Sequence, residues 1–257
     1  MNLVFASGFL APQRVFGQDY FRGVREAFPA ACFPQVPVAG SIVRRAQALA
    51  EQIADFRFDG PRAPIHIVAH SMGGLDARCA LDRDFCGLAA RVGSLSTIGT
   101  PHHGSPIADL LIGPESSPSS TRPRRVVYEA LRRALEIFRV PTGALEELTV
   151  ARAERFNREH PTIANIPCYC YAGNRPESYP LRLLAAYIRS TGRTPDERDN
   201  DGLVSVASAT WSPLAEAPWA TDHLGEVGHT LLPPSFASRF PHLEALRRIV
   251  QRAQAGL

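Results

Sequence analysis

Short apolar runs alternate along the chain with longer segments in which apolar residues recur every three or four positions. Short continuous apolar runs are typical of strands covered on both faces, and the longer period is typical of the helices that cover them. Strands are predicted at residues 3–6, 36–39, 65–69, 92–98, 166–172 and 203–205, and helices at 18–28, 41–56, 72–81 and 241–254. This order predicts an α/β fold with a mostly parallel central sheet and helices on both of its faces.

Residues 41–56 show the helical period most clearly, and Ser41 has the side chain expected of an N-cap. The apolar stripe consists of Ile42, Ala46, Leu49, Ile53 and Phe56. The polar residues that we place off this stripe are Arg44, Arg45, Gln47 and Glu51.

The alternation of strands and helices stops between residues 106 and 143. Residues 114–123 are rich in proline and serine, as loops are, and residues 124–139 have the pattern of an amphipathic helix. We therefore predict one domain over residues 1–257, with a helical insertion at residues 106–143.

Composition excludes several classes of protein. The formal charge is only +3, and the basic residues, all of them arginine, are scattered along the chain, so no nucleic-acid partner is expected. No apolar run has the ~18 residues of a membrane-spanning helix, and no signal peptide is recognisable, so we expect a cytoplasmic protein or one secreted and then processed. The cysteines match no zinc pattern and are interpreted as buried apolar residues: Cys32, Cys79, Cys86, Cys168 and Cys170.

The run I-H-I-V-A-H-S-M-G-G-L at residues 65–75 carries the strongest chemical signal. A predicted strand passes through A-x-S-x-G directly into a predicted helix, which is the pattern of a nucleophile elbow. Small residues beside the serine let strand and helix pass closely, and the start of the helix directs N–H groups toward developing negative charge. The alternative is a serine on an ordinary turn, but the doubled Gly73–Gly74 favours Ser71 as a nucleophile.

A nucleophilic serine needs a histidine base and an acid, in the chain order Ser, acid, His for this type of elbow. The histidines that come late enough to be considered are His160, His223, His229 and His242. Asp201, in the run D-N-D-G-L-V-S, is the best acid, because Gly202 permits a turn just before a predicted strand. Asp199 and Asp222 compete with it, and we interpret both as solvated loop acids.

Eight short runs resemble, in the same order, landmarks of the bacterial true lipases, which are secreted triacylglycerol lipases of the α/β-hydrolase class. The resemblance extends from Asn2 to about Gly228, through L-V-F-A-S-G-F-L, F-G-Q-D-Y-F, A-H-S-M-G-G, G-T-P-H-H-G-S, A-L-E-E-L, R-F-N-R-E-H-P, D-N-D-G-L-V-S and D-H-L-G-E-V. It implies the catalytic triad Ser71, Asp201 and His223. It also implies a serine hydrolase that cleaves carboxylic esters of the acylglycerol type through an acyl-enzyme, with no cofactor.

The resemblance further implies an oxyanion hole made by the backbone N–H groups of Met72 and Phe9. The family's H-G-φ motif aligns with residues 7–9, so Ser7 replaces its histidine. The predicted helix at 124–139 has the family's lid position, which makes its apolar residues Val127, Leu131 and Phe138 candidates for contact with substrate and with a lipid–water interface. A helix packed permanently over the sheet is the alternative.

Two family features are expected to be missing. The family's calcium ligands fall on Gly225 and His229, whose side chains offer no oxygen, so we predict no metal. The second cysteine of the family's disulfide falls near Ala207. The same triad would also serve a polyester or phospholipid acyl-ester hydrolase, and a non-catalytic binding protein with this fold is a further alternative.

Overall fold

The computed structural model describes residues 1–9, 14–15, 18–38, 40–112, 128–129, 142–163, 165–230 and 240–256. Its central sheet is parallel, with the strand order β1-β4-β5-β6. These strands are β1 (Asn2–Ala6), β4 (Ile65–His70), β5 (Val92–Ile98) and β6 (Cys168–Tyr171). The short strands β2 (Arg14–Val15) and β3 (Gln18–Asp19) form a separate antiparallel pair.

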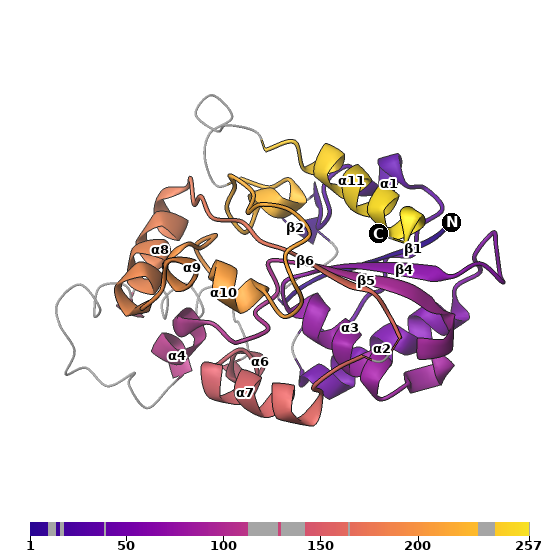
Figure 1. Ribbon diagram of the computed structural model, residues 1–257, viewed down its shortest axis with the longest axis horizontal. Helices are drawn as coiled ribbons and strands as arrows, with labels where there is room; N and C mark the ends of the chain where they lie inside the picture. Colours follow the sequence, from indigo (N-terminus) through magenta and orange to yellow (C-terminus); the bar gives the residue numbers. More distant parts are fainter. Residues whose placement is uncertain are drawn as a thin grey trace.

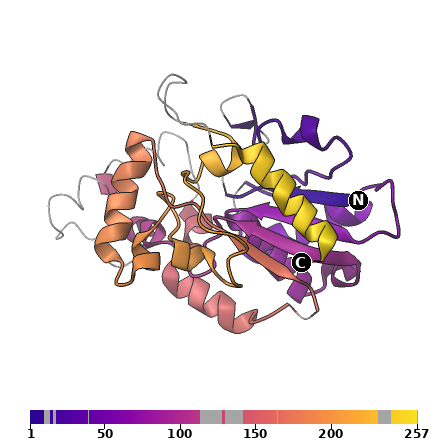
Figure 2. The same ribbon diagram turned by 45° about the horizontal axis from the view of Figure 1, so that its top comes forward.

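Helices cover both faces of the sheet (Figures 1 and 2). Val4 and Ala6 of β1 belong to the hydrophobic core on one face, and Leu3 and Phe5 belong to the core on the other, as the alternation of a strand requires. The first core is closed by α2 (Ile42–Asp55), α3 (Met72–Asp82) and α7 (Val150–Glu159). The second is closed by α1 (Val24–Ala27) and α11 (His242–Ala255). The predicted α/β architecture is confirmed.

Further helices lie beyond the carboxyl ends of the strands, on the left in Figure 1. These are α4 (Pro106–Ile112), α8 (Tyr179–Thr191), α9 (Pro195–Arg198) and α10 (Val206–Ala209), while α6 (Thr142–Glu146) packs against α4. The short helices η1 (Phe85–Gly87), η2 (Ala89–Arg91) and η4 (Gly225–Val227) lie within connecting segments. The loops that follow β1, β4, β5 and β6 therefore meet at one end of the sheet.

The long helices follow the sequence closely. The predictions at residues 41–56, 72–81 and 241–254 correspond to α2, α3 and α11, and the Ser41 hydroxyl caps α2 by accepting from the Arg44 N–H at 3.3 Å. One position on α2 differs from the prediction. Arg45 was placed off the apolar stripe, yet it is fully buried, because an ion pair with Asp76 satisfies its guanidinium.

Three shorter predictions are wrong. Within residues 18–28 only Val24–Ala27 is helical, because Gly23 has φ 69° and residues 18–19 pair as a strand. Residues 36–38 form no strand, since Pro34 and Pro37 lack the N–H donors that a ladder needs. Residues 203–205 form a turn, closed by the Asp201 N–H donating to the Val204 carbonyl oxygen at 3.1 Å.

The cysteines are all free thiols. Cys32, Cys79 and Cys170 are buried, as predicted, but Cys168 is half-buried and Cys86 is exposed. Cys86 lies in the connection between α3 and β5 with φ 58°, where the chain turns at the surface. The interpretation of all of them as buried residues is therefore wrong for Cys86.

The predicted insertion lies mostly outside the described residues, which include only residues 106–112, 128–129 and 142–143 of it. The lid candidates Val127, Leu131 and Phe138 are not among the described residues. The single domain over 1–257 and its insertion at 106–143 remain predictions. Within the described part of the chain, no helix combines the length and the apolarity needed to span a bilayer.

Candidate active site

Ser71 stands on a strained turn between a strand and a helix. β4 ends at His70, α3 begins at Met72, and Ser71 itself has φ 56° and ψ −134°. A non-glycine residue at such angles costs free energy and persists only where the surrounding structure enforces it. The Ser71 N–H donates to the Ile98 carbonyl oxygen at 2.9 Å, which ties the turn to the end of the neighbouring strand β5.

The doubled glycine after Ser71 has a steric cause. A Cβ on Gly73 would lie 2.7 Å from the carbonyl oxygens of both Ala6 and Ser7, and a Cβ on Gly74 would lie 2.2 Å from the Thr100 hydroxyl oxygen. Any side chain at these positions would push α3 away from β1 and from the segment after β5. The small residues seen in the sequence therefore allow the close packing that an elbow requires.

Asp201 and His223 form a buried hydrogen-bonded pair. His223 Nδ1 lies 2.7 Å from Asp201 Oδ2, and the side chains are 7% and 0% exposed. The His223 backbone N–H also donates to the Asp201 carbonyl oxygen at 3.0 Å. Because the carboxylate accepts from Nδ1–H, His223 Nε2 is left with a lone pair that can accept a proton.

The local sequence explains why Asp201 holds this position. Its Oδ1 accepts from the backbone N–H groups of Leu203 at 2.8 Å and Val204 at 2.7 Å. Gly202 has φ 100°, and a Cβ there would lie 2.8 Å from the Leu181 Cβ. The D-G-L-V run thus folds into a turn whose backbone N–H groups bind Asp201 Oδ1, so that Asp201 Oδ2 is free to accept from His223.

The two other candidate acids, Asp199 and Asp222, differ from each other in burial. Asp199 is exposed, as the sequence analysis expected. Asp222 is buried rather than solvated, because its oxygens accept from the backbone N–H groups of Gly225 at 2.8 Å and Glu177 at 3.4 Å. Burial raises the pKa of Asp222, and these hydrogen bonds oppose the rise.

The remaining candidate histidines are engaged elsewhere. His160 Nδ1 lies 2.5 Å from Asp82 Oδ2, and His242 Nε2 lies 2.8 Å from the Arg22 carbonyl oxygen. His229 Nε2 lies within 3.0 Å of two backbone carbonyl oxygens, those of residues 19 and 20. Of the four candidates, His223 is the one with a buried carboxylate acceptor at the carboxyl end of the sheet.

Ser71 and His223 come to the same end of the sheet from different segments. The ring of His70, the residue before Ser71, lies with its centroid 4.5 Å from that of His223. No hydrogen bond joins the Ser71 hydroxyl to the His223 ring in this structure. Such bonds are often long before substrate binds and shorten in the reactive complex.

The loop of residues 7–9, expected to supply an oxyanion donor, passes directly beside Ser71. A Cβ on Gly8 would lie 2.6 Å from Ser71 Cβ. Met72 is the first residue of α3, so its N–H has no partner within the helix. Phe9 is partly buried against the hydrophobic core, which positions its backbone beside the elbow.

A buried ion pair that was not predicted from the sequence holds this loop. Arg45 binds the Asp76 carboxylate through Nε and Nη2 at 2.8 to 3.2 Å, and Nη2 also donates to the Gly8 carbonyl oxygen at 3.2 Å. Asp76 lies on α3, the helix that begins after Ser71. The position of Arg45 three residues after Ile42, on the edge of the apolar stripe, was the signal that could have revealed it.

The positions aligned with the family's calcium ligands do not fit a calcium ion. Gly225 has no side-chain oxygen, and a Cβ there would lie 2.1 Å from the Thr221 hydroxyl oxygen, so an aspartate would collide with the Thr221 side chain. His229, at the second position, uses its Nε2 on backbone carbonyl oxygens. A calcium ion requires several oxygen ligands, which these two side chains do not supply.

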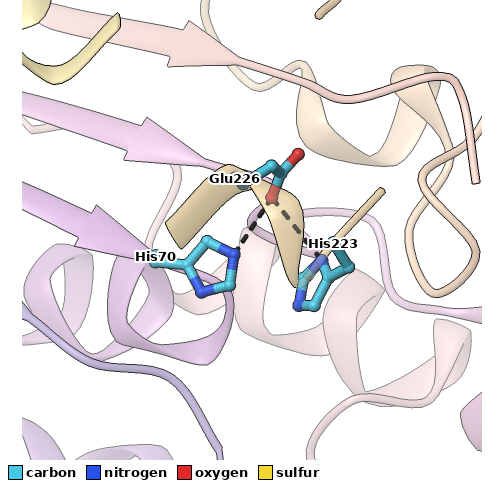
Figure 3. A group of neighbouring side chains, drawn as sticks. All are labelled: His70, His223 and Glu226. Atoms are coloured by element: carbon cyan, nitrogen blue, oxygen red, sulfur yellow. Dashed lines mark hydrogen bonds and ion pairs between the residues drawn. The ribbon is translucent and has the colours of Figure 1, made fainter. Parts of the chain in front are cut away.

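A second buried carboxyl group lies beside His223, and its position was not predicted from the sequence. Glu226 Oε2 lies 3.0 Å from His70 Nε2 and 3.7 Å from His223 Nδ1 (Figure 3). These three atoms are close enough together to surround a metal ion, but His223 Nδ1 already donates to Asp201. The position of the glutamate three residues after His223, in H-L-G-E-V, was the available signal.

The chain resembles named lipases and esterases. No protein-family model matches it. Triacylglycerol lipase 2 of Saccharomyces cerevisiae is 30% identical over 203 residues, which are 74% of this chain and 55% of the yeast protein, so the chain spans about half the length of that relative. A triacylglycerol lipase of Pseudomonas fragi is 24% identical, over 88% of this chain and 87% of that one.

The fold comparison agrees with these relatives. The crystal structure of a metagenomic carboxyl esterase superposes with a TM-score of 0.74 at 24% identity, covering 100% of this chain and 76% of that one. The elbow at Ser71, the parallel sheet that carries it and the sequence relatives are consistent with one another. The comparisons therefore confirm the resemblance to lipases that the sequence motifs indicated, and they show that the chain shares its fold with a solved esterase structure.

Proposed function

We propose that the protein is a serine hydrolase that cleaves carboxylic esters through an acyl-enzyme, with Ser71, Asp201 and His223 as its catalytic triad. The observation that carries this proposal is the buried Asp201–His223 pair, 2.7 Å apart, at the end of the sheet where the strained Ser71 turn lies. A triad of this kind needs no metal or organic cofactor.

The geometry supports a definite sequence of proton transfers. His223 Nε2 takes the proton of the Ser71 hydroxyl as the Ser71 oxygen attacks the ester carbonyl carbon, and then returns it to the departing alcohol. Asp201 keeps the other nitrogen protonated and stabilises the imidazolium that forms. A water molecule then attacks the acyl-enzyme with His223 again as base, which releases the carboxylic acid and restores Ser71.

The negative charge on the carbonyl oxygen needs donors that are in place before the reaction. The N–H of Met72 is one, since it stands at the start of α3 directly after the nucleophile. The N–H of Phe9 is the other, on the loop whose Gly8 lies against Ser71. Backbone donors held in this way stabilise the transition state without reorganising during the reaction.

We propose acylglycerols as the substrate class, with transient contact at a lipid–water interface. The names of the sequence relatives support acylglycerols, and the apolar positions Val127, Leu131 and Phe138 support the interface contact. An emulsified triacylglycerol, phosphatidylcholine vesicles and an aliphatic polyester film, assayed side by side, separate this proposal from the two alternative ester classes. A series of p-nitrophenyl esters from acetate to palmitate then gives the preferred acyl length.

The triad is tested with p-nitrophenyl butyrate and three proteins: wild type, Ser71→Ala and Ser190→Ala. Ser190 is an exposed serine on α8, so its variant controls for the loss of a hydroxyl group as such. Wild type and Ser190→Ala are expected to hydrolyse the ester at equal rates, and Ser71→Ala at a rate near background. Equal rates for wild type and Ser71→Ala would reject Ser71 as nucleophile. An inactive wild type would favour the non-catalytic binding protein.

A further inference from the structure

Glu226 has a position that the triad does not explain. It lies on η4, its side chain is completely buried, and its Oε2 faces His70 Nε2 at 3.0 Å and His223 Nδ1 at 3.7 Å (Figure 3). A Cβ on Gly99 would lie 2.2 Å from Glu226 Oε2, so the backbone that follows β5 packs directly against this oxygen. A group enclosed this tightly must satisfy its hydrogen bonds within the protein.

The available donors are too few for a charged carboxylate. His223 Nδ1 carries a single proton, and Asp201 accepts it at 2.7 Å, so Glu226 does not receive it. Glu226 Oε1 lies against the Gly173 backbone and has no hydrogen bond of good geometry. An ionised carboxylate at this position would be buried with a single good donor, the ring of His70.

The charges of the neighbouring groups also favour an uncharged Glu226. Asp201 is a carboxylate partner of the same histidine nitrogen, and two buried carboxylates that share one site do not both ionise readily. Burial is the largest cause that raises the pKa of Glu226 well above its usual range, the charge of Asp201 adds to the rise, and the Gly173 backbone opposes it in part. Burial also holds the pKa of His70 well below its usual range, so His70 does not supply a compensating positive charge.

We propose that Glu226 is an uncharged carboxylic acid in the resting protein and donates its proton to His70 Nε2. His70 Nδ1 then carries the ring proton and donates it to the hydroxyl oxygen of Tyr20, which lies 2.5 Å away. Glu226, His70 and Tyr20 thus form a neutral chain of hydrogen bonds. They act as positioning residues and do not enter the chemistry.

This chain connects the loop of the catalytic histidine with the oxyanion loop. The Tyr20 hydroxyl oxygen would lie 2.8 Å from a Cβ on Gly8, so Tyr20 packs against the proposed oxyanion loop. His70 directly precedes Ser71, so the hydrogen bonds from Glu226 to Tyr20 pass beside the elbow, and the contact of Tyr20 with Gly8 extends them to residues 7–9. Burial raises the pKa of the Tyr20 phenol well above its usual value, so the phenol stays neutral and keeps its place in the chain.

The neutral state of Glu226 also affects His223, the proposed base. A second negative charge 3.7 Å from His223 Nδ1 would stabilise the imidazolium form over the neutral ring that accepts the proton of Ser71. This consequence rests on the proposed triad. The titratable groups that face Glu226 are Asp201 and Asp222 by charge, and His70 and His223 by contact.

Infrared difference spectroscopy tests the protonation directly, without relying on activity. The wild-type spectrum minus the Glu226→Gln spectrum at neutral pH is expected to contain the carbonyl stretch of an uncharged carboxylic acid, shifted in heavy water and lost only at alkaline pH. Glu244→Gln, which replaces an exposed glutamate on α11, is the control and should give no such band. The absence of the band from the Glu226 difference spectrum would overturn the proposal.

Kinetics then test the role in the reaction. Glutamine is neutral and its amide can donate to His70 Nε2, so Glu226→Gln is expected to keep kcat within about threefold and to leave the acid limb of the kcat/KM profile unmoved. If Glu226 were ionised in the wild type, the acid limb would fall by about one pH unit or more in this variant. Glu226→Leu, which removes the donor, is expected to lower kcat more than tenfold.

The two proposals fail in distinguishable ways. The infrared band is present or absent whether or not Ser71→Ala abolishes hydrolysis, because it reports only the carboxyl group. A band with an inactive wild-type protein would reject the proposed function and keep the neutral Glu226. If the band were missing and Ser71→Ala still lost its activity as expected, the neutral Glu226 would be rejected and the triad would stand.

Discussion

Arg45 Nη2 donates to the carbonyl oxygen of Gly8 at 3.2 Å, while the same guanidinium is bound to Asp76 on the helix of the elbow. In a trans peptide the C=O and the next N–H point in opposite directions. By fixing the Gly8 carbonyl, Arg45 therefore fixes the direction of the Phe9 N–H, the proposed second oxyanion donor. The ion pair thus links α3, the helix that follows Ser71, with the loop of the proposed oxyanion hole.

Arg45→Lys is expected to lower kcat about tenfold to a hundredfold with little change in KM. A lysine ammonium keeps the charge but does not hold a carboxylate through two nitrogens and a carbonyl oxygen at once. The upper bound follows from the loss of ~10²–10³ when an oxyanion donor is removed altogether. Arg44→Lys, at an exposed position one residue earlier, is the matched control. An equal kcat in wild type and Arg45→Lys would disprove the link.

Gly8→Ala tests the close approach of the loop to the nucleophile. The added Cβ would lie 2.6 Å from Ser71 Cβ and 2.8 Å from the Tyr20 hydroxyl oxygen, so the loop has to shift. We expect kcat to fall by about 10²-fold, as for the loss of one oxyanion donor. Gly143→Ala, where a Cβ meets nothing within 4 Å, should leave kcat unchanged. Full activity in Gly8→Ala would place the oxyanion hole elsewhere.

Asp201→Asn is expected to lower kcat by ~10⁴, because an asparagine does not hold His223 in the tautomer that leaves Nε2 free. Asp199→Asn is the control, since the Asp199 side chain is exposed two residues earlier in the chain. Initial rates on p-nitrophenyl butyrate, with circular dichroism to check folding, provide the measurement. If Asp201→Asn kept wild-type activity while Asp199→Asn lost it, Asp199 and not Asp201 would be the acid of the triad.

The thiols should differ in reactivity according to their burial. Burial raises the pKa of Cys32 to about 12, and of Cys79 and Cys168 to about 11, so almost no thiolate exists there near pH 8. Cys170 is buried as well, whereas Cys86 is exposed. A thiol reagent at pH 8 is expected to label one cysteine rapidly in the native protein and all of them in denaturant. Rapid labelling of native Cys86→Ser would contradict the described burial.

Calcium removal should not destabilise the protein. Gly225 and His229 offer no side-chain oxygen at the positions that the sequence motifs align with calcium ligands, and Gly225 has no space for one. We expect the same Tm in excess EDTA and in excess calcium. Gly225→Asp should lower Tm in either condition, because its side chain collides with Thr221. A large fall of the wild-type Tm in EDTA would show that calcium binds through other ligands.

The sequence by itself determined the features that depend on local pattern. The periods of the apolar residues located α2, α3 and α11, and the elbow motif located Ser71, because steric demands at a strand-to-helix turn restrict the residues allowed there. The short segments at 18–28, 36–39 and 203–205 were predicted wrongly, since a glycine at positive φ, two prolines and a side-chain-capped turn outweigh hydrophobicity over so few residues.

Only the tertiary structure decided which distant groups share one environment. Arg45 and Glu226 are residue types usually found at the surface, and their spacing in the sequence does not show that one is buried against Asp76 and the other between His70 and His223. Burial removes water, and the hydrogen bonds and charges of packed neighbours from separate segments then set orientation and protonation. These terms depend on distances across the fold, which a pattern along the chain does not contain.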